Sequence, residues 1–389
     1  MKFTPSFIVT SLLSLGLVLT AASEGVETPT TNRVEKAASQ TEPPKNANAA
    51  RIEPVGKGLQ PVPRIMVIGT GGTISGGIDP ATGREKDLTA KDLVGLLPTL
   101  RGKVDIEEED FSKIPSSAMT PELQFKLAQR VVELFKVRPD LAGIVITHGT
   151  DSLEETAFLL DLVVNDPRPI VFAAAQRLPS VSDSDGPRNL ENAIRIAASP
   201  QARDKGVLVS LNEDIHSARY VKKSHSIAVE SFQSGKKGMI GTVDNGAVIF
   251  YQAPLNQVTI PAKTVEPNVD LVRLVAGDQG KFINHAVATK ATGIVVEAFG
   301  RGNLPSPVRV AVGDARKAGV IVVIVSRVQG GRVEISPKLL AAGVIGGEDL
   351  DGLKARMLLA VALGATKDIP TIQRWFHQAG GVVKQENTE

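Results

Sequence analysis

Two threonine-bearing loops are the parts of this sequence best suited to chemistry. In "IMVIGTGGTISGG" (65–77) an apolar run leads into two glycine pairs, and Thr70 and Thr73 stand on either side of the first pair. In "ITHGTDSLEET" (146–156) Thr150 is followed directly by Asp151. A threonine hydroxyl becomes a useful nucleophile when a base removes its proton, so either loop could carry covalent catalysis. Taken alone, each loop also fits a structural role, as a glycine turn or as a helix cap.

The glycine loop does not have the spacing of a phosphate-binding loop. A dinucleotide-binding loop counted from Gly69 would need glycine where Ile74 stands, and a P-loop counted from Gly72 would need lysine where Ile78 stands. The loop therefore either makes a turn or aims a hydroxyl.

A base for such a hydroxyl could come from the segment "NEDIHSARYVKKSHS" (212–226). Lysine can serve as a base when partial burial lowers its pKa, and Lys222 and Lys223 are both candidates, although either could instead be a solvated surface charge. Other classes lack support, because there is no G-x-S-x-G motif and the histidines are not spaced as metal ligands. They are His148, His216, His225, His285 and His377. We expect no metal and no cofactor, and we interpret His148 as a packed polar residue at a strand end.

Short apolar runs of β-branched residues must position these loops. They occur at 64–69, 141–147, 168–174 and 206–211, and their continuity is typical of strands in a parallel sheet covered on both faces. Helical patterns lie between them. One follows Thr120 as N-cap, and another opens on Ser152, three residues before Glu155, with the spacing of a capping box. The sequence predicts an α/β fold in which both loops follow strands at the carboxyl edge of the sheet, where ligands bind.

A second alternation of strand and helix begins near residue 268. We therefore predict a larger N-terminal α/β domain with a mostly parallel sheet (61–250), an extended linker (251–267) and a smaller C-terminal α/β domain (268–389).

The first residues, "MKFTPSFIVTSLLSLGLVLTAAS", have the layout of a secretory signal peptide cleaved near Ser23. Residues 24–60 are polar and almost free of large apolar side chains, which predicts a disordered tether. We expect a periplasmic or secreted protein with no membrane association after cleavage. The chain of 389 residues has no cysteine and a net charge of +2, so disulfides are excluded and nucleic acid is an unexpected partner.

Several motifs together resemble the bacterial L-asparaginase (glutaminase-asparaginase) family, especially its exported type. They are "TGGTISGG", "ITHGTDSLEETAFLLDLVV", "SDSDGPRNLENAI", "GVLVSLNEDIHSARYVKK", "RGN" and "SRVQGG", in one order over about residues 61 to 385. The family hydrolyses the side-chain amide of asparagine, and often of glutamine, without metal or organic cofactor. The resemblance implies the same activity on a small amino-acid amide, in a homotetramer whose sites are completed by neighbouring subunits.

The resemblance also implies roles for individual residues. Thr73 matches the nucleophile that forms the acyl-enzyme, while Thr150, Asp151 and Lys223 match the threonine-aspartate-lysine group. Ser116 matches the serine that binds the substrate α-carboxylate, and Asp151 would take the α-ammonium. Gly72 and Ser117 complete the implied substrate-binding set.

The sequence departs from the family pattern around the substrate. The tyrosine of the exported enzymes is missing after "TGGTI", and Ser117 and Ala118 stand where glutamine and aspartate are common. Arg301 stands where the neighbouring subunit's asparagine is expected, and Glu334 is the nearest candidate for its glutamate. Arg301 could hold a second carboxylate, pair with Glu85 or Asp87, or simply face solvent.

Two other interpretations remain open at this point. One is a catalytically weak or degenerate relative that binds an amino acid or amide, because of the missing tyrosine. The other is the similar ammonia-generating subunit of a tRNA amidotransferase, which the secretory signal and the near-neutral charge oppose.

Overall fold

The computed structural model describes residues 62–77 and 87–381. The signal peptide and tether predicted for residues 1–23 and 24–60 lie outside these residues. Within the described ranges no helix has the length and apolar character to cross a bilayer.

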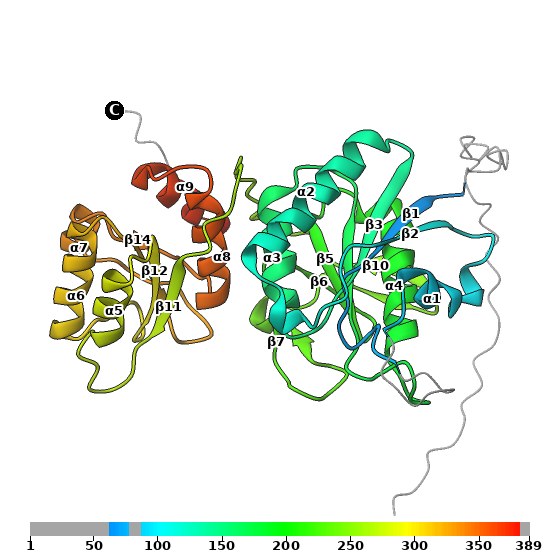
Figure 1. Ribbon diagram of the computed structural model, residues 1–389, viewed down its shortest axis with the longest axis horizontal. Coiled ribbons are helices and arrows are strands. Elements are labelled where there is room, and N and C mark those ends of the chain that lie inside the picture. Colours follow the sequence, from blue (N-terminus) through cyan, green and yellow to red (C-terminus); the bar gives the residue numbers. More distant parts are fainter. Residues whose placement is uncertain (1–61, 78–86, 382–389) are drawn as a thin grey trace, which may run out of the picture. The chain divides into compact units, whose positions relative to one another are not determined.

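The described chain contains an eight-stranded sheet with the strand order β10-β9-β6-β5-β4-β3-β1-β2 (Figure 1). Its first five strands in the sequence run parallel. They are β1 (Arg64–Gly69), β2 (Asp105–Asp110), β3 (Leu141–Thr147), β4 (Ile170–Ala173) and β5 (Val207–Leu211). The other three pair antiparallel at the far side: β6 (Asp214–Ser217), β9 (Gly241–Asp244) and β10 (Ala247–Phe250).

The strand order reverses at β1, which pairs with β2 on one side and β3 on the other. After β1 the chain forms β2 on one side of β1, and it then crosses to the other side of β1 to form β3. In open parallel sheets a crevice forms outside the carboxyl ends of the strands at such a point, and ligands bind there. The two threonine loops follow β1 and β3, so the topology places them at this crevice.

Helices cover both faces of the large sheet, as Figure 1 shows. Strand residues alternate between the faces, so Met66 and Ile68 belong to the cluster that includes α2 (Pro121–Val137) and α3 (Leu153–Val163). Ile65 and Val67 belong to the cluster on the other side, which includes α1 (Ala90–Gly95) and α4 (Gly186–Ala198). Burial of β1 on both faces explains its continuous apolar sequence.

A four-stranded parallel sheet with the order β11-β12-β13-β14 forms from residue 269 onward. Its strands are β11 (Val269–Arg273), β12 (Gly293–Ala298), β13 (Ile321–Ser326) and β14 (Ile345–Gly346). The helices of this region are α5 (Lys281–Ala288), α6 (Ser306–Lys317), α7 (Pro337–Ala341), α8 (Gly352–Leu363) and α9 (Ile369–Ala379).

Short elements complete the described chain. Strands β7 (Lys222–Lys223) and β8 (Phe232–Gln233) pair antiparallel, and single 3-10 turns lie at Pro98–Leu100, Ser116–Ala118, Pro200–Ala202 and Gly235–Lys237.

The predicted α/β class and the four strands named from the sequence are confirmed. The Thr120 cap is also confirmed, since its side chain accepts a hydrogen bond from the backbone N–H of Leu123. The capping box at Ser152 is wrong. Ser152 occupies the N-cap position, but its hydroxyl makes no capping bond and donates instead to the carbonyl oxygen of Ser116, at 2.6 Å.

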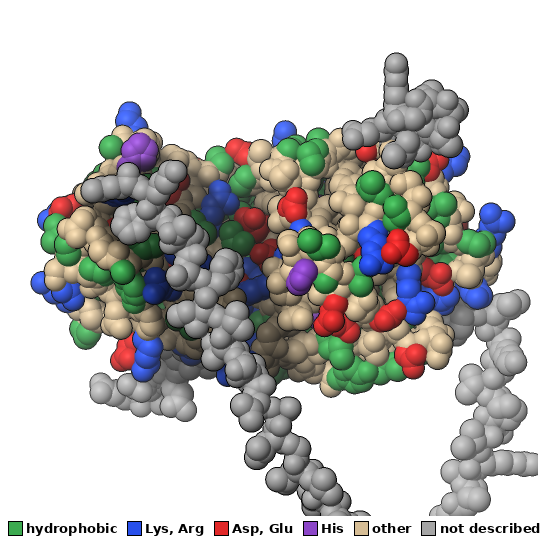
Figure 2. All heavy atoms as spheres, turned by 90° about the horizontal axis from the view of Figure 1, so that it is seen from below, with side chains coloured by type: hydrophobic (Ala, Val, Ile, Leu, Met, Phe, Trp, Pro, Cys, Tyr) green, Lys and Arg blue, Asp and Glu red, His purple; other side chains and the backbone are tan. Residues whose placement is uncertain are grey.

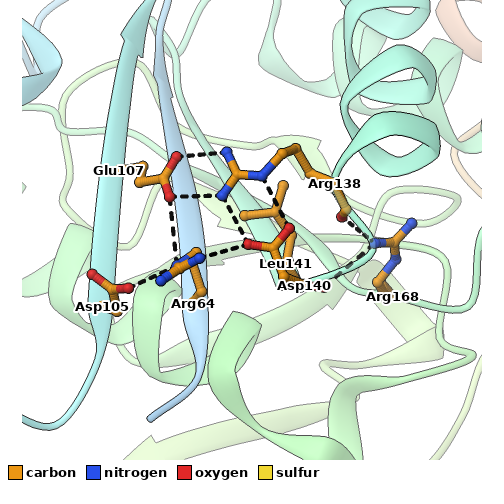
Figure 3. Close-up of polar contacts among 7 residues, drawn as sticks. All are labelled: Arg64, Asp105, Glu107, Arg138, Asp140, Leu141 and Arg168. Atoms are coloured by element: carbon orange, nitrogen blue, oxygen red, sulfur yellow. Dashed lines mark hydrogen bonds and ion pairs between the residues drawn. The ribbon is translucent and has the colours of Figure 1, made fainter. Parts of the chain in front are cut away.

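Strand β2 is the last strand of the large sheet, and its acidic side chains are held by arginines. Figure 3 shows Arg138 placing two guanidinium nitrogens against the carboxylate of Glu107, each at 2.7 Å, while Arg64 binds Asp105 and Asp140. The Arg138 hydrogen bonds lower the pKa of Glu107. On the face drawn in Figure 2, Lys and Arg side chains are likewise interspersed with Asp and Glu.

Candidate active site

The two threonines of "TGGT" have different surroundings. Thr70 is buried, and both its backbone N–H and its hydroxyl donate to the carbonyl oxygen of Thr147, at 3.1 and 2.8 Å. It therefore ties the end of β1 to the end of β3. Thr73 lies in the following turn and lines a pocket. The next residue, Ile74, is buried in the core and anchors the turn beneath Thr73.

Glycine is required at position 72 because another backbone lies against it. Gly72 has φ +86°, and a Cβ atom there would lie 2.3 Å from the Cα atom of Gly149. No side chain fits between two backbones at that separation. The contact brings Thr73 and Thr150, the residues after the two glycines, to adjacent positions, and both line the same pocket.

Ser116 joins the second loop to a third segment. Its hydroxyl oxygen accepts a hydrogen bond from the backbone N–H of Asp151 at 3.1 Å, and its carbonyl oxygen accepts one from the Ser152 hydroxyl at 2.6 Å. Ser116 is buried and lines the pocket. Because its hydroxyl oxygen is engaged as an acceptor, its proton is free to be donated to a ligand.

Lys223 places a cation against the second loop. Its Nζ atom donates to the Thr150 hydroxyl oxygen at 2.9 Å and to a carboxylate oxygen of Asp151 at 2.7 Å. The side chain of Lys223 is mostly buried, with 18% exposed, whereas that of Asp151 is 64% exposed and faces the pocket. The need for a base pointed to Lys222 and Lys223 alike, and the family resemblance selected Lys223; in the structure the two lysines have different partners. Lys222 pairs with Asp351 at 2.9 Å and Lys223 reaches Thr150, as expected for neighbours that point to opposite sides of a strand.

The pocket has a volume of about 470 Å3, which suits a small molecule. Among the described residues it is lined by the four loops that follow β1, β2, β3 and β4, and its charged lining groups are Asp87, Lys113 and Asp151. Its other lining residues include Gly72, Thr73, Ser116, Gly149, Thr150 and Leu178.

His148, next to the second loop, is fully buried and packs edge-on against Phe172. Burial lowers its pKa to about 4. The neutral ring then donates from Nδ1 to the carbonyl oxygen of Gly149, at 2.8 Å. This confirms the interpretation of His148 as a packed polar residue.

The remaining predicted site residues lie apart from this pocket. Ser117 is exposed and does not belong to the part of the described chain that lines it. Arg301 pairs with Glu334 at 3.0 Å, with both side chains largely exposed, so the alternative partner Asp87 is not used. Glu85 lies outside the described residues.

The sequence analysis did not identify three residues that lie near the site. The Glu154 carboxylate accepts a hydrogen bond from the backbone N–H of Lys223 at 2.8 Å, and burial raises its pKa. Lys113 lines the pocket. Lys354 is buried in α8, and its Nζ atom donates to the carbonyl oxygen of Ala218 at 2.7 Å. A lysine inside the apolar run "GLKARMLLAVAL" was the available signal for Lys354, because an unpaired charge is rarely buried.

Family models match both parts of the chain. Residues 64–256 match the model described as Asparaginase, N-terminal, and residues 268–376 match the Glutaminase/Asparaginase C-terminal domain.

Individual relatives match over most of their length. The chain is 31% identical over 359 residues to L-asparaginase 2 of Bacillus subtilis (strain 168), covering 90% of this chain and 94% of the relative. It is 32% identical over 326 residues to the "Probable L-asparaginase periplasmic" of Haemophilus influenzae, covering 81% and 93%. A solved structure, the "Probable Cytoplasmic L-asparaginase" from Campylobacter jejuni, aligns with a TM-score of 0.73 and 35% identity, over 81% of this chain and 99% of that one. With both family models matched and the site loops in place, the chain belongs to the asparaginase family.

Proposed function

We propose that this chain hydrolyses the side-chain amide of L-asparagine, and of L-glutamine as a further substrate, to the acid and ammonia. The observation that carries the proposal is the Lys223 ammonium, 2.9 Å from the Thr150 hydroxyl oxygen and 2.7 Å from an Asp151 carboxylate oxygen, beside the pocket that Thr73 lines. Family membership supports the reaction, and the C-terminal family model supports glutamine alongside asparagine.

The pocket can bind the amino-acid end of the substrate through groups of opposite character. The exposed Asp151 carboxylate faces the pocket and would take the α-ammonium group. The Ser116 hydroxyl, which already accepts from the Asp151 N–H, would donate its proton to the α-carboxylate. Gly72 leaves the backbone of the first loop open to the substrate, and Ser117 would lie at the outer edge of this binding region.

The chemical step is an acyl transfer to Thr73. Its hydroxyl oxygen attacks the amide carbon, backbone N–H groups of the glycine loop stabilise the oxyanion, and the hydroxyl proton passes to the nitrogen that leaves as ammonia. Water then attacks the acyl-threonine ester, which releases the acid and restores the hydroxyl. Thr150 and Lys223 act as the proton relay in both steps, because the lysine donates to the Thr150 oxygen and leaves the Thr150 proton free to face the pocket.

Ammonia release by the purified chain tests this proposal, with L-asparagine, L-glutamine and their D-forms as substrates. We expect Thr73→Ala to lower kcat by at least about 10³-fold while the protein stays folded, because the acyl-enzyme cannot form. Thr73→Ser, which keeps the hydroxyl, should retain measurable turnover. A folded wild-type chain that binds these amino acids without turnover would instead favour the degenerate binding relative.

The proposal extends to export and assembly. The secretory layout of residues 1–23 supports a periplasmic or secreted protein. Mass spectrometry of the protein recovered from the periplasm or the medium tests whether the chain is cleaved near Ser23. The domain limits proposed from the sequence are 61–250, 251–267 and 268–389, with residues 24–60 as a tether. A homotetramer would allow Arg301 and Glu334 of one subunit to complete the pocket of another.

A further inference from the structure

Residues of the C-terminal half of the chain make hydrogen bonds with segment 218–223, which ends in Lys223. Lys354 donates to the carbonyl oxygen of Ala218 at 2.7 Å, and Arg219 donates to the carbonyl oxygen of Ala379 at 3.0 Å. Arg219 also pairs with Asp349, at 2.6 Å. Segment 218–223 therefore has a fixed position relative to helices α8 and α9.

Two residues at the start of α8, Asp351 and Lys354, provide the contacts nearest to the site, and we name this pair the α8 clamp. Asp351 caps α8 by accepting from the backbone N–H of Lys354, at 3.0 Å, and it also binds the Lys222 ammonium at 2.9 Å. Lys222 is the residue directly before Lys223, so the contact at Asp351 fixes the backbone from which the Lys223 side chain departs.

The α8 clamp also holds the loop that Lys223 must reach. The Lys354 Nζ atom lies 3.4 Å from the carbonyl oxygen of Glu154, in the first turn of α3, only three residues after Asp151. The Glu154 carboxylate in turn binds the backbone N–H of Lys223 at 2.8 Å. One buried ammonium thus spans the two segments whose side chains meet at Thr150.

Burial of a lysine side chain costs free energy of desolvation, and the groups around Lys354 show what offsets that cost. Lys354 is 1% exposed and lies over the ring of Phe158, at 5.2 Å. Burial lowers its pKa, while the charges of Asp351 and Glu154 oppose that shift and those of Arg219 and Lys222 add to it. An apolar residue of similar volume would fill this space without a desolvation penalty, so the hydrogen bonds to the two carbonyl groups are the specific contribution of lysine here.

We propose that Asp351 and Lys354 are positioning residues for the reaction, which set the distance from the Lys223 ammonium to Thr150 and Asp151 by holding Lys222, Ala218 and Glu154. The inference rests on the proposed function, in which Lys223 serves the proton relay. A displacement of about 1 Å of a catalytic group can lower the rate roughly 10²-fold, so the α8 clamp controls kcat rather than substrate binding.

Lys222→Met and Asp351→Asn test this inference in the full chain. Asparagine keeps the helix cap at position 351, and an ion pair that is partly open to water contributes little to stability, so both variants should fold. We expect kcat to fall roughly ten- to hundredfold while KM stays within about twofold. The urea midpoint should be unchanged in Lys222→Met and lowered in Asp351→Asn, because the Asp351 carboxylate also offsets the buried charge of Lys354. Lys222→Arg should restore most of the activity, because its guanidinium can still bind Asp351.

The control is Lys317→Met, which removes an exposed ion pair to Asp314 in α6 and should leave kcat at the wild-type value. A reduced kcat at constant KM with rescue by arginine supports the inference. Wild-type kcat in both Lys222→Met and Asp351→Asn, beside an inactive Lys223→Met, overturns the inference and leaves the proposed function intact. No turnover by the folded wild-type chain overturns both. Lys354→Met should lose more kcat than Lys222→Met or Asp351→Asn. If Lys354→Met does not fold, the other two variants still test the inference.

Discussion

At the scale of single residues, the candidate site depends on side chains that are absent as much as on those that are present. The contact of Gly72 with Gly149 leaves no room for a Cβ atom, yet it is this contact that makes Thr73 and Thr150 neighbours. The reactive hydroxyl groups are therefore brought together by backbone packing, which neither threonine could achieve through its own side chain.

Gly72→Ala should destabilise the protein by about 2 to 4 kcal/mol, because the residue has φ +86° and the added methyl group would overlap Gly149. Urea unfolding measures this change. Gly95→Ala is the matched control, because a Cβ atom at the end of α1 would meet nothing within 4 Å. That variant should be about as stable as the wild type, or slightly more so. Equal stability of the two variants would contradict the close backbone approach at Gly72.

His148 should make the protein less stable as the pH falls. Its pKa is about 4 in the folded state, against about 6.5 in an unfolded chain, so between these values the unfolded state binds a proton that the folded state does not. The stabilisation is complete above pH 6.5, and about 3 kcal/mol of it is lost as the pH falls to 4.

The measurement is the free energy of unfolding of the wild type minus that of His148→Gln, from pH 7.5 to 4. This difference is needed because other buried groups also have shifted pKa values, His216 and Asp161 among them. The pKa of His216 is also about 4, while that of Asp161 is raised to about 6 by burial and contributes with the opposite sign. Both effects are common to the two proteins and cancel. The exposed His285→Gln serves as a control, and a difference that does not change with pH would refute the prediction.

At the scale of elements, the serine at the start of α3 makes a hydrogen bond to the site instead of capping the helix. Ser152 occupies the N-cap position, but its hydroxyl binds the carbonyl oxygen of Ser116. The sequence pattern predicted the start of the helix and could not predict this exchange, because Ser116 lies 36 positions away in the chain.

Ser152→Ala should therefore affect substrate binding as well as stability. We expect a loss of about 1 kcal/mol in the free energy of unfolding and a rise in KM of roughly fivefold, because Ser116 loses one of its two contacts with the second loop. Thr120→Ala, at the N-cap of α2, should cost a similar stability with no change in KM. Equal effects of the two substitutions on KM would show that Ser152 only starts the helix.

At the scale of the whole molecule, the sequence predicted most of what depends on local pattern. Apolar continuity identified β1, β3, β4 and β5, and the motif resemblance identified the family. What local pattern could not predict were contacts between distant segments, and the grouping of Lys223 with Thr150 and Asp151 was implied only by the family resemblance. No local pattern indicated that Lys354 lies beside Glu154, 200 positions earlier, or that Lys222 pairs with Asp351.

The effect of replacing Arg301 on substrate preference should show whether a neighbouring subunit completes the pocket. If a neighbouring subunit completes the pocket, the exposed pair of Arg301 and Glu334 presents opposite charges near a bound amino acid. We expect light scattering to give four times the mass of the mature chain, and Arg301→Asn to change the ratio of kcat/KM between asparagine and glutamine. The same mutation should leave the unfolding free energy nearly unchanged, because surface ion pairs contribute about 0 to 1 kcal/mol. A tetramer with an unaltered ratio would place Arg301 outside the pocket.

The acidic strand β2 has a consequence for how copies of this protein meet in solution. Five of its six residues carry carboxylates, most of them in ion pairs, so a second molecule pairing along this edge would have to remove water from charged side chains, which disfavours strand pairing and aggregation. The arginines that hold Glu107 and Glu109 from the neighbouring helix and loop keep these groups in place along the edge. The lowered pKa of Glu107 extends this protection toward acid conditions. The ion pairs that order this edge therefore also help keep the protein dispersed when it is concentrated.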